Sequence, residues 1–344
     1  MSTTMKAKRK SLLSRMRFAL VLASVVACPA FGHAQPACKG RDMLSELRES
    51  DPPAHALLAQ RAAATTNTQA MLWRIDKAGL PPSYLLGTAH LSDDRIVNRS
   101  AGIAGAIAAS STMALEVDDL SPEAMAAAVS KNVHLFVYTD GRQLNHTLEP
   151  DQFAKAASVL AAAGMPEQVA ARIKPWLVFM MLAVPACERQ RQASGLQPLD
   201  MQLAADARKR GIPVVGLETI ESQLAMLAAI PEQQQVAMLK AVLHYADRTE
   251  DQMETMVQLY LKRQMGLALP FQHELARRAG VAADAFTSFE KDIVGKRNAA
   301  MAVKAAPLLA KGGTFIGVGA LHLVGADGLV ELFRQSGYTL TAVE

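Results

Sequence analysis

The chain has 344 residues, half of them hydrophobic, which is enough to bury one large core or two smaller ones without metal or disulfide staples. Its formal charge of +4 comes from the first 34 residues, which hold six of the 36 Lys and Arg and none of the 32 Asp and Glu. The remainder carries about −2 and has no basic stripe. Nothing therefore supports nucleic-acid binding, which relies on Lys and Arg to neutralise phosphates.

Residues 1–34 have the pattern of an export signal. A basic segment between Lys6 and Arg17 precedes an apolar core at 18–27 and a small-residue cleavage site ending at Ala34. This core of about ten residues is shorter than the roughly 20 needed to span a bilayer. We therefore expect a periplasmic or secreted protein without a transmembrane span. The run ending in Cys28 also resembles a lipoprotein cleavage box, which would add a lipid anchor, but Pro29 directly after it favours cleavage near Ala34.

Two cysteines follow the predicted signal, Cys38 and Cys187. In an oxidising compartment they are expected to form one disulfide that ties the N-terminal arm to the middle of the chain. The alternative is a pair of free thiols. Because the chain has no C-x-x-C spacing, a zinc–thiolate site is not expected.

The first predicted elements are a helical pair at 41–64, broken at Pro52-Pro53, and a hairpin of two strands at 70–75 and 83–87. A small-residue helix at 101–110 and a strand at 112–117 come next. Ser121 and Pro122 then have the residue types of an N-cap and a first helical position, and they begin a long helical stretch.

Three more strands are predicted in the second half of the chain, a buried one at 212–217 and two others at 314–318 and 338–343, with a helix at 329–335 before the last. Strands separated by helices predict an α/β fold with a central, mainly parallel β-sheet and surrounding helices. The helical stretches at about 121–210 and 219–310 are predicted as insertions that form a helical layer. Residues 35–344 would then make a single domain.

One local motif occurs twice. The segments SYLLGTAHL at 83–91 and FIGVGALHL at 315–323 both consist of an apolar strand, a glycine, two small or apolar residues, a histidine and a leucine. This repetition makes His90 and His322 equivalent. The motif glycines, Gly87 and Gly319, would let the backbone turn sharply and approach a metal or substrate closely.

Two further predicted strands end in a carboxylate, at Glu116 and Glu218. Because ligands collect outside the carboxyl ends of parallel strands, we expect both histidines and both glutamates at one edge of the sheet. Two imidazoles and two carboxylates are ligands that a divalent transition metal or a hydrolytic site uses. Arg297, ahead of the second histidine strand, is expected either to hold a carboxylate at this edge or to be a surface arginine.

Two other interpretations stand beside a metal site. A histidine after a strand is often a hydrogen-bonded structural residue, although the duplicated motif weighs against this. Residues 317–322 also approach the dinucleotide fingerprint G-x-G-x-x-G, with Glu344 about 20 residues further on where a ribose-binding acid belongs. His322 stands where the third glycine is required, which weakens that interpretation.

The motifs in order resemble the TraB/GumN family, which is related to the Tiki proteases. The resemblance covers nearly the whole chain from about Cys38, and its GumN-type bacterial branch is indicated by Lys174-Pro175-Trp176, Cys187-Glu188 and Leu199-Asp200. The segments that carry it are Gly87-Thr88-Ala89-His90, Leu115-Glu116, Gly216-Leu217-Glu218-Thr219, Arg297-Asn298 and Gly319-Ala320-Leu321-His322.

This resemblance implies a fold similar to erythromycin-esterase-like and haem-binding ChaN-like proteins, and a metal-dependent peptidase activity that uses manganese or cobalt rather than zinc. Carried over by position, His90 and His322 would be metal ligands, Glu116 a ligand or general base, and Glu218 and Arg297 supporting groups.

We therefore expect an exported metal-dependent hydrolase that acts on a peptide or protein. Glu116 or Glu218 would take a proton from water, and Arg297 or the metal would stabilise the oxyanion. The alternative hypothesis is a non-catalytic periplasmic protein that sequesters a peptide signal or haem in the same place.

Overall fold

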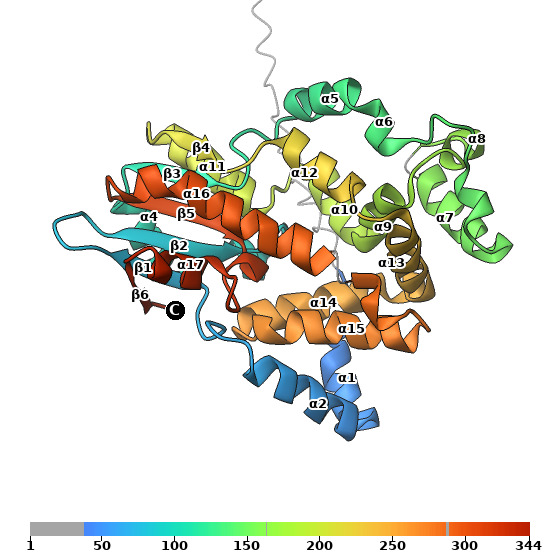
Figure 1. Cartoon of the computed structure of the whole chain (residues 1–344), viewed down its shortest axis with the longest axis horizontal. Coiled ribbons are helices and arrows are strands. Elements are labelled where there is room, and N and C mark those ends of the chain that lie inside the picture. Colours follow the sequence, from blue (N-terminus) through green and yellow to red (C-terminus); the bar gives the residue numbers. More distant parts are fainter. Residues whose placement is uncertain (1–37, 163, 287–288) are drawn as a thin grey trace, which may run out of the picture. The chain divides into compact units, whose positions relative to one another are not determined.

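The computed structural model describes residues 38–162, 164–286 and 289–344 (Figure 1). The predicted export signal at 1–34, with Cys28, lies outside these residues. The described chain belongs to one unit by its internal contacts. Within it, no helix is both long and apolar enough to cross a membrane.

A six-stranded mixed sheet in the order β4-β3-β5-β2-β1-β6 lies at the centre. Its neighbours β4, β3, β5 and β2 are parallel, whereas β1 runs antiparallel to β2 and β6. The predicted hairpin is confirmed as β1 and β2, and the predicted α/β class with mostly parallel strands is also confirmed. The strand bounds are β1 (Leu72–Asp76), β2 (Ser83–Thr88), β3 (Thr112–Leu115), β4 (Val214–Gly216), β5 (Thr314–Gly319) and β6 (Thr339–Ala342).

Helices fill every connection of the sheet except the β1–β2 hairpin. Before β3 the chain forms α1 (Met43–Ser50), α2 (Pro52–Ala63), α3 (Asp94–Val97) and α4 (Ala101–Ala108). Between β3 and β4 it forms α5 (Pro122–Lys131), α6 (Val133–Phe136), α7 (Pro150–Ala162), α8 (Glu167–Ala170), α9 (Pro175–Ala183), α10 (Ala186–Ala193) and α11 (Leu199–Lys209). After β4 come α12 (Ile220–Ala228), α13 (Glu232–His244), α14 (Thr249–Leu261), α15 (Ala268–Arg278), α16 (Arg297–Leu309) and, after β5, α17 (Leu329–Gln335).

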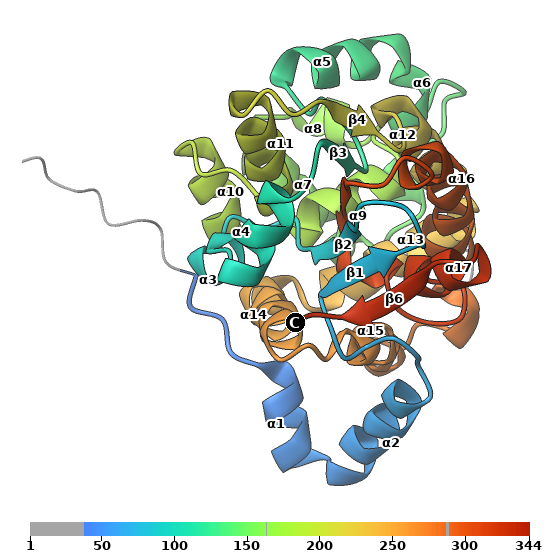
Figure 2. The ribbon, with the colours of Figure 1, turned by 90° about the vertical axis from the view of Figure 1, so that its left-hand side faces the viewer.

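Each face of the sheet has its own hydrophobic core. On one face, Leu203 of α11 packs with Met113 and Phe315 of the sheet. On the other, Met301 of α16 and Phe333 of α17 pack with sheet residues such as Ile316. Figures 1 and 2 show α16 and α17 together on one side of the strands, with α4 and α11 on the other. The last helix of each long insertion therefore covers the sheet, and the helices before it are free to build a separate layer.

That separate layer has a core of its own. Helices α7, α8, α9 and α13 enclose buried residues that include Leu160, Val178 and Leu239, each of which is 0% exposed. These helices lie together in Figure 1, beside the carboxyl ends of the parallel strands. The predicted helical layer is thus formed by part of the insertions, whereas α11, α14, α15 and α16 contribute to the cores on the faces of the sheet.

Strand β4 differs from its prediction. The apolar segment at 212–217 predicts a fully buried strand, but β4 extends only from Val214 to Gly216 and lies at the edge of the sheet. Val215 is 36% exposed. An apolar, partly β-branched segment does not reveal which strand lies at an edge, because that depends on the order of the strands.

A disulfide and hydrogen bonds to α14 fix the N-terminal arm to the rest of the chain. The predicted disulfide is confirmed: Cys38 and Cys187 are bonded, with Cα atoms 5.4 Å apart across 149 residues of sequence. Beyond it, the amide of Met43 donates to the hydroxyl of Thr255 on α14 at 2.8 Å. A closed loop of this length is worth roughly 4 to 5 kcal/mol in the chain-entropy description.

Candidate functional site

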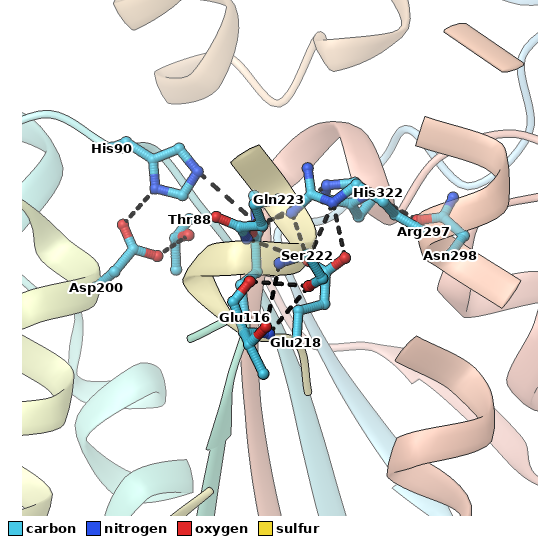
Figure 3. Close-up of polar contacts among 12 residues, drawn as sticks. Thr88, His90, Glu116, Asp200, Glu218, Ser222, Gln223, Arg297, Asn298 and His322 are labelled. Carbon is cyan, nitrogen blue, oxygen red and sulfur yellow. Dashed lines mark hydrogen bonds and ion pairs between the residues drawn. The ribbon is translucent and has the colours of Figure 1, made fainter. Parts of the chain in front are cut away.

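Four residues from the strand ends lie together at the carboxyl edge of the sheet (Figure 3). His90 follows β2, Glu116 follows β3, Glu218 follows β4 and His322 follows β5. Oε1 of Glu116 lies 4.0 Å from Nε2 of His90 and 3.7 Å from Nε2 of His322. Both ring nitrogens thus face the same carboxylate oxygen, and Glu116 is the centre of the cluster.

Arg297 joins the two glutamates. Its Nη2 donates to Oε2 of Glu116 and to Oε2 of Glu218, each at 2.6 Å, and its Nε donates to Glu218 at 3.0 Å. The side chains of Arg297 and Glu116 are 11% exposed and that of Glu218 is 5% exposed. Arg297 is therefore a buried bridge between two carboxylates and not a surface arginine. It occupies the first position of α16, directly after the π-helical turn Phe289–Lys296, a form that often occurs at functional sites.

The two motif glycines have different physical roles. A Cβ at Gly319 would lie 3.2 Å from Oε1 of Glu116 and 3.4 Å from Nε2 of His90. A Cβ at Gly87 would instead lie 3.0 Å from the Cα of Ala320, in the other motif. Neither glycine has a positive φ. Close approach, and not a sharp turn, is the reason for glycine at both positions.

His90 is held from one side by a carboxylate that the sequence did not predict as a site residue. Oδ2 of Asp200, in the first turn of α11, lies 2.8 Å from Nδ1 of His90, and Thr88 donates to the other oxygen. The negative charge of Asp200 raises the pKa of His90 to about 9. The imidazole is still 63% exposed.

His322 is held by an amide and is nearly enclosed, with 7% of its side chain exposed. Its Nδ1 lies 2.6 Å from Oδ1 of Asn298, whose Nδ2 donates to the carbonyl of Asp327 at 2.8 Å. This second bond fixes which end of the amide faces the ring, so Nδ1 of His322 carries the proton and Nε2 has a free lone pair. Burial lowers the pKa of His322 to about 4, which keeps the imidazole neutral at physiological pH.

Glu116 stays ionised in spite of its surroundings. Burial alone would raise the pKa of Glu116, but the neighbouring imidazoles and guanidinium hold it at about 2. The amide of Gly319 also donates to Oε1 at 2.7 Å, and Gln223 on α12 donates to Oε2 at 3.2 Å. An anion with this many donors is a good ligand for a cation and a weak base.

The donor atoms suit a divalent transition metal. Nε2 of His90, Nε2 of His322 and Oε1 of Glu116 are the nitrogen and oxygen types that such ions bind, and Nε2 of His90 would lose its proton on binding. The distances of 3.7 and 4.0 Å exceed the roughly 3.4 Å between tetrahedral ligands with bonds of about 2.1 Å, so the groups would close by less than an ångström. Within the described chain, no three His, Cys, Asp or Glu side chains already have full metal-ligand spacing.

Three residues of this network were not predicted from the sequence as site residues: Asp200, Asn298 and Gln223. Each lies in the first turn or two of a helix that points toward the sheet edge. Asn298 directly follows Arg297, and Asp200 lies in a segment that resembles the family. The sequence therefore contained a signal for both of these residues. Gln223 has no comparable signal, because nothing in the sequence shows that α12 begins beside Glu116.

The family comparison covers the part of the chain that builds this cluster. Residues 71–342 match the model of the TraB/PrgY/gumN family, and this range contains all six strands and every residue of the network. The chain belongs to the TraB/PrgY/gumN family. No curated protein and no solved structure matches it significantly. Helices α1 and α2 and Cys38 lie outside the range that defines the family, whereas Cys187 lies within it.

Proposed function

We propose that this family member is an exported, metal-dependent hydrolase that cleaves peptide bonds. The observation that carries the proposal is the pair of facing acceptors at His322 and Glu116. A neutral Nε2 and an ionised Oε1, both acceptors, lie 3.7 Å apart. Two such acceptors repel one another unless a cation lies between them.

In this proposal His90, His322 and Glu116 hold the metal. Manganese or cobalt, the metals that the Tiki resemblance implies, would polarise the scissile carbonyl and acidify water when bound. Asp200 and Asn298 would serve the two histidines in the same way, because each engages Nδ1 and turns Nε2 toward Glu116.

The remaining groups have separate roles. Glu116, with a pKa of about 2, is a better ligand than base. Glu218 is then the carboxylate that accepts a proton from water, since its oxygens keep acceptor capacity beside Arg297 and Gln223. Nη1 of Arg297 has no hydrogen-bond partner among the described residues and is the donor that would stabilise an oxyanion.

The metal proposal is tested by measuring metal content and affinity of the purified protein. Calorimetry with Mn²⁺, Co²⁺ and Zn²⁺ would compare wild type with His90→Ala and His322→Ala. His134→Ala is the matched control, because His134 is an exposed histidine on α6, away from the cluster. We expect binding of about one ion in wild type and the control, and its loss in both site variants. No binding in wild type at micromolar metal would reject the metallohydrolase.

One observation favours a binding protein in place of an enzyme. Arg297 engages both glutamates, and its charge helps to hold the pKa of Glu116 at about 2, so this carboxylate is a weak base. Such a protein would capture a peptide signal or haem at the same edge. Glu218→Gln separates the two functions: an enzyme would keep metal and peptide binding and lose cleavage of a peptide library, whereas a binder would show no cleavage in wild type.

Export is proposed from the N-terminal pattern and supported by the disulfide. A bonded cysteine pair persists in an oxidising compartment and is rare in the cytosol. Mass spectrometry of protein recovered from the periplasmic fraction would give the mature N-terminus. We expect cleavage near Ala34, and a diacylglycerol-modified Cys28 would instead establish the lipoprotein alternative.

A further inference from the structure

A second carboxylate, Glu188 on α10, is completely enclosed and takes no part in the strand-end cluster. Its side chain is 0% exposed, and a carboxylate in such a place requires specific donors. Oε1 of Glu188 accepts from the amide and from the hydroxyl of Ser92, each at 2.8 Å, and from Gln192 at 3.1 Å. Oε2 lies 3.5 Å from Nη1 of Arg191.

Ser92 connects this carboxylate to the site, because it follows His90 by two residues. The next residue, Asp93, is also buried, at 3% exposure, and its carboxylate accepts from Arg95 and Arg191. The backbone directly after His90 is therefore held by charged groups on α10 and α3. The imidazole itself is 63% exposed and has little packing that would fix it.

Helix α10 is in turn fixed by the disulfide. Cys187 directly precedes Glu188 and is bonded to Cys38 in the N-terminal arm. The amides of Lys39 and Arg41 in that arm donate to Glu250 and Asp251 at 2.8 Å, which ties the arm to the start of α14. A continuous set of bonds thus leads from α14 through the arm and the disulfide to Glu188 and then to Ser92.

We propose that Glu188 is a positioning residue for His90, and that the Cys38–Cys187 disulfide keeps it in place. Two hydrogen bonds to Ser92 set the backbone after β2, and this directs the imidazole between Asp200 and Glu116. The metal-binding consequence rests on the proposed function, whereas the effect on the backbone does not. His322 needs no such support, because it is enclosed.

Hydrogen exchange measured by mass spectrometry tests the effect on the backbone. In Glu188→Ala we expect roughly tenfold faster exchange at Ser92, seen in peptides covering 86–96, because a charge-assisted bond is lost. Gln190→Ala is the control, since Gln190 is an exposed residue on the same helix. If Glu188→Ala does not fold, Ser92→Ala replaces it: it removes the hydroxyl bond but keeps the amide bond, and should speed exchange in the same peptides by a smaller factor. Exchange equal to that of Gln190→Ala would overturn the proposal.

Mn²⁺ affinity tests the consequence for His90. We expect about tenfold weaker binding in Glu188→Ala and in the Cys38→Ser/Cys187→Ser pair, as for other residues that orient a ligand. Glu188→Gln keeps an acceptor for Ser92 and should stay close to wild type. If Glu188→Gln weakens binding as much as Glu188→Ala, the acceptor for Ser92 is not the cause, and the proposal is wrong. If wild type binds no Mn²⁺, the proposed function fails, and the exchange experiment alone decides the positioning role.

Discussion

The two histidine turns share one sequence pattern and have quite different surroundings. The turn after β2 places His90 at the surface, 63% exposed, where Asp200 raises its pKa to about 9. The turn after β5 places His322 in the interior, 7% exposed, where burial lowers its pKa to about 4. Both rings still direct Nε2 to one oxygen of Glu116. A repeated motif thus fixes where a side chain emerges, while the neighbouring helices decide its charge and mobility.

The largest loss of folding stability is expected from changing Arg297. This residue binds Glu116, the carboxylate that both histidines face. Arg297→Ala would leave Glu116 and Glu218 buried without their cation, which should lower the free energy of unfolding by about 3 to 5 kcal/mol. Urea denaturation would measure it. Arg297→Lys keeps the charge but loses the paired donors and should have an intermediate cost. A loss below about 1 kcal/mol for Arg297→Ala would show that the bridge is not formed in solution.

Replacing each histidine by alanine should show that the two turns contribute differently to folding stability. His322→Ala removes an enclosed ring and leaves Asn298 without its partner, so we expect a loss of about 2 to 3 kcal/mol. His90→Ala removes a mostly exposed ring and should cost less than about 1 kcal/mol. Thermal and urea unfolding of the two variants, side by side, would test this order. Equal losses would mean that the turns are equally enclosed.

The motif glycines should differ in the same experiment but for another reason. The Cβ in Gly87→Ala would meet the backbone of Ala320, which has to shift, at a cost of about 1 to 3 kcal/mol. The Cβ in Gly319→Ala would meet only side-chain atoms of the cluster, so we expect less than about 1 kcal/mol and weaker metal binding. A larger stability loss in Gly319→Ala than in Gly87→Ala would contradict these contacts.

Acid should weaken the His90 turn through Asp93. Hydrogen bonds from Arg95 lower the pKa of Asp93 to about 2. Because this folded-state pKa is below the ordinary value of 3.8, the stabilisation is present above pH 4 and is lost as the pH falls toward 2. We expect roughly 2 kcal/mol from this group, measured as the difference in urea stability between wild type and Asp93→Asn. The difference should shrink between pH 4 and pH 2, and a constant difference would assign the effect to another carboxylate.

Much of the sheet could be predicted, because short-range patterns determine it. The hairpin, the strands of both histidine motifs and the helix at 329–335 follow from apolar period and turn residues. The predicted burial of strand β4 was wrong, because its place at the sheet edge depends on strand order. The predicted strand-end residues could be named because parallel strands end at one edge. Arg297 could be named only with a surface position as its alternative, because it lies 181 residues from Glu116 in sequence, and Asp200, 110 residues from His90, was not predicted as a site residue.

The sequence by itself determined which backbone segments form strands, that His90, Glu116, Glu218 and His322 follow them, and which cysteines pair. These features depend on local periodicity, on the residue at a strand end and on there being only two cysteines after the predicted signal. The tertiary structure alone decided that Arg297 bridges two carboxylates and that one histidine is exposed while the other is enclosed. These features depend on helices that come from distant parts of the chain and pack at the sheet edge. The burial and the charge of a side chain depend on all the groups around it, so the local sequence does not determine them.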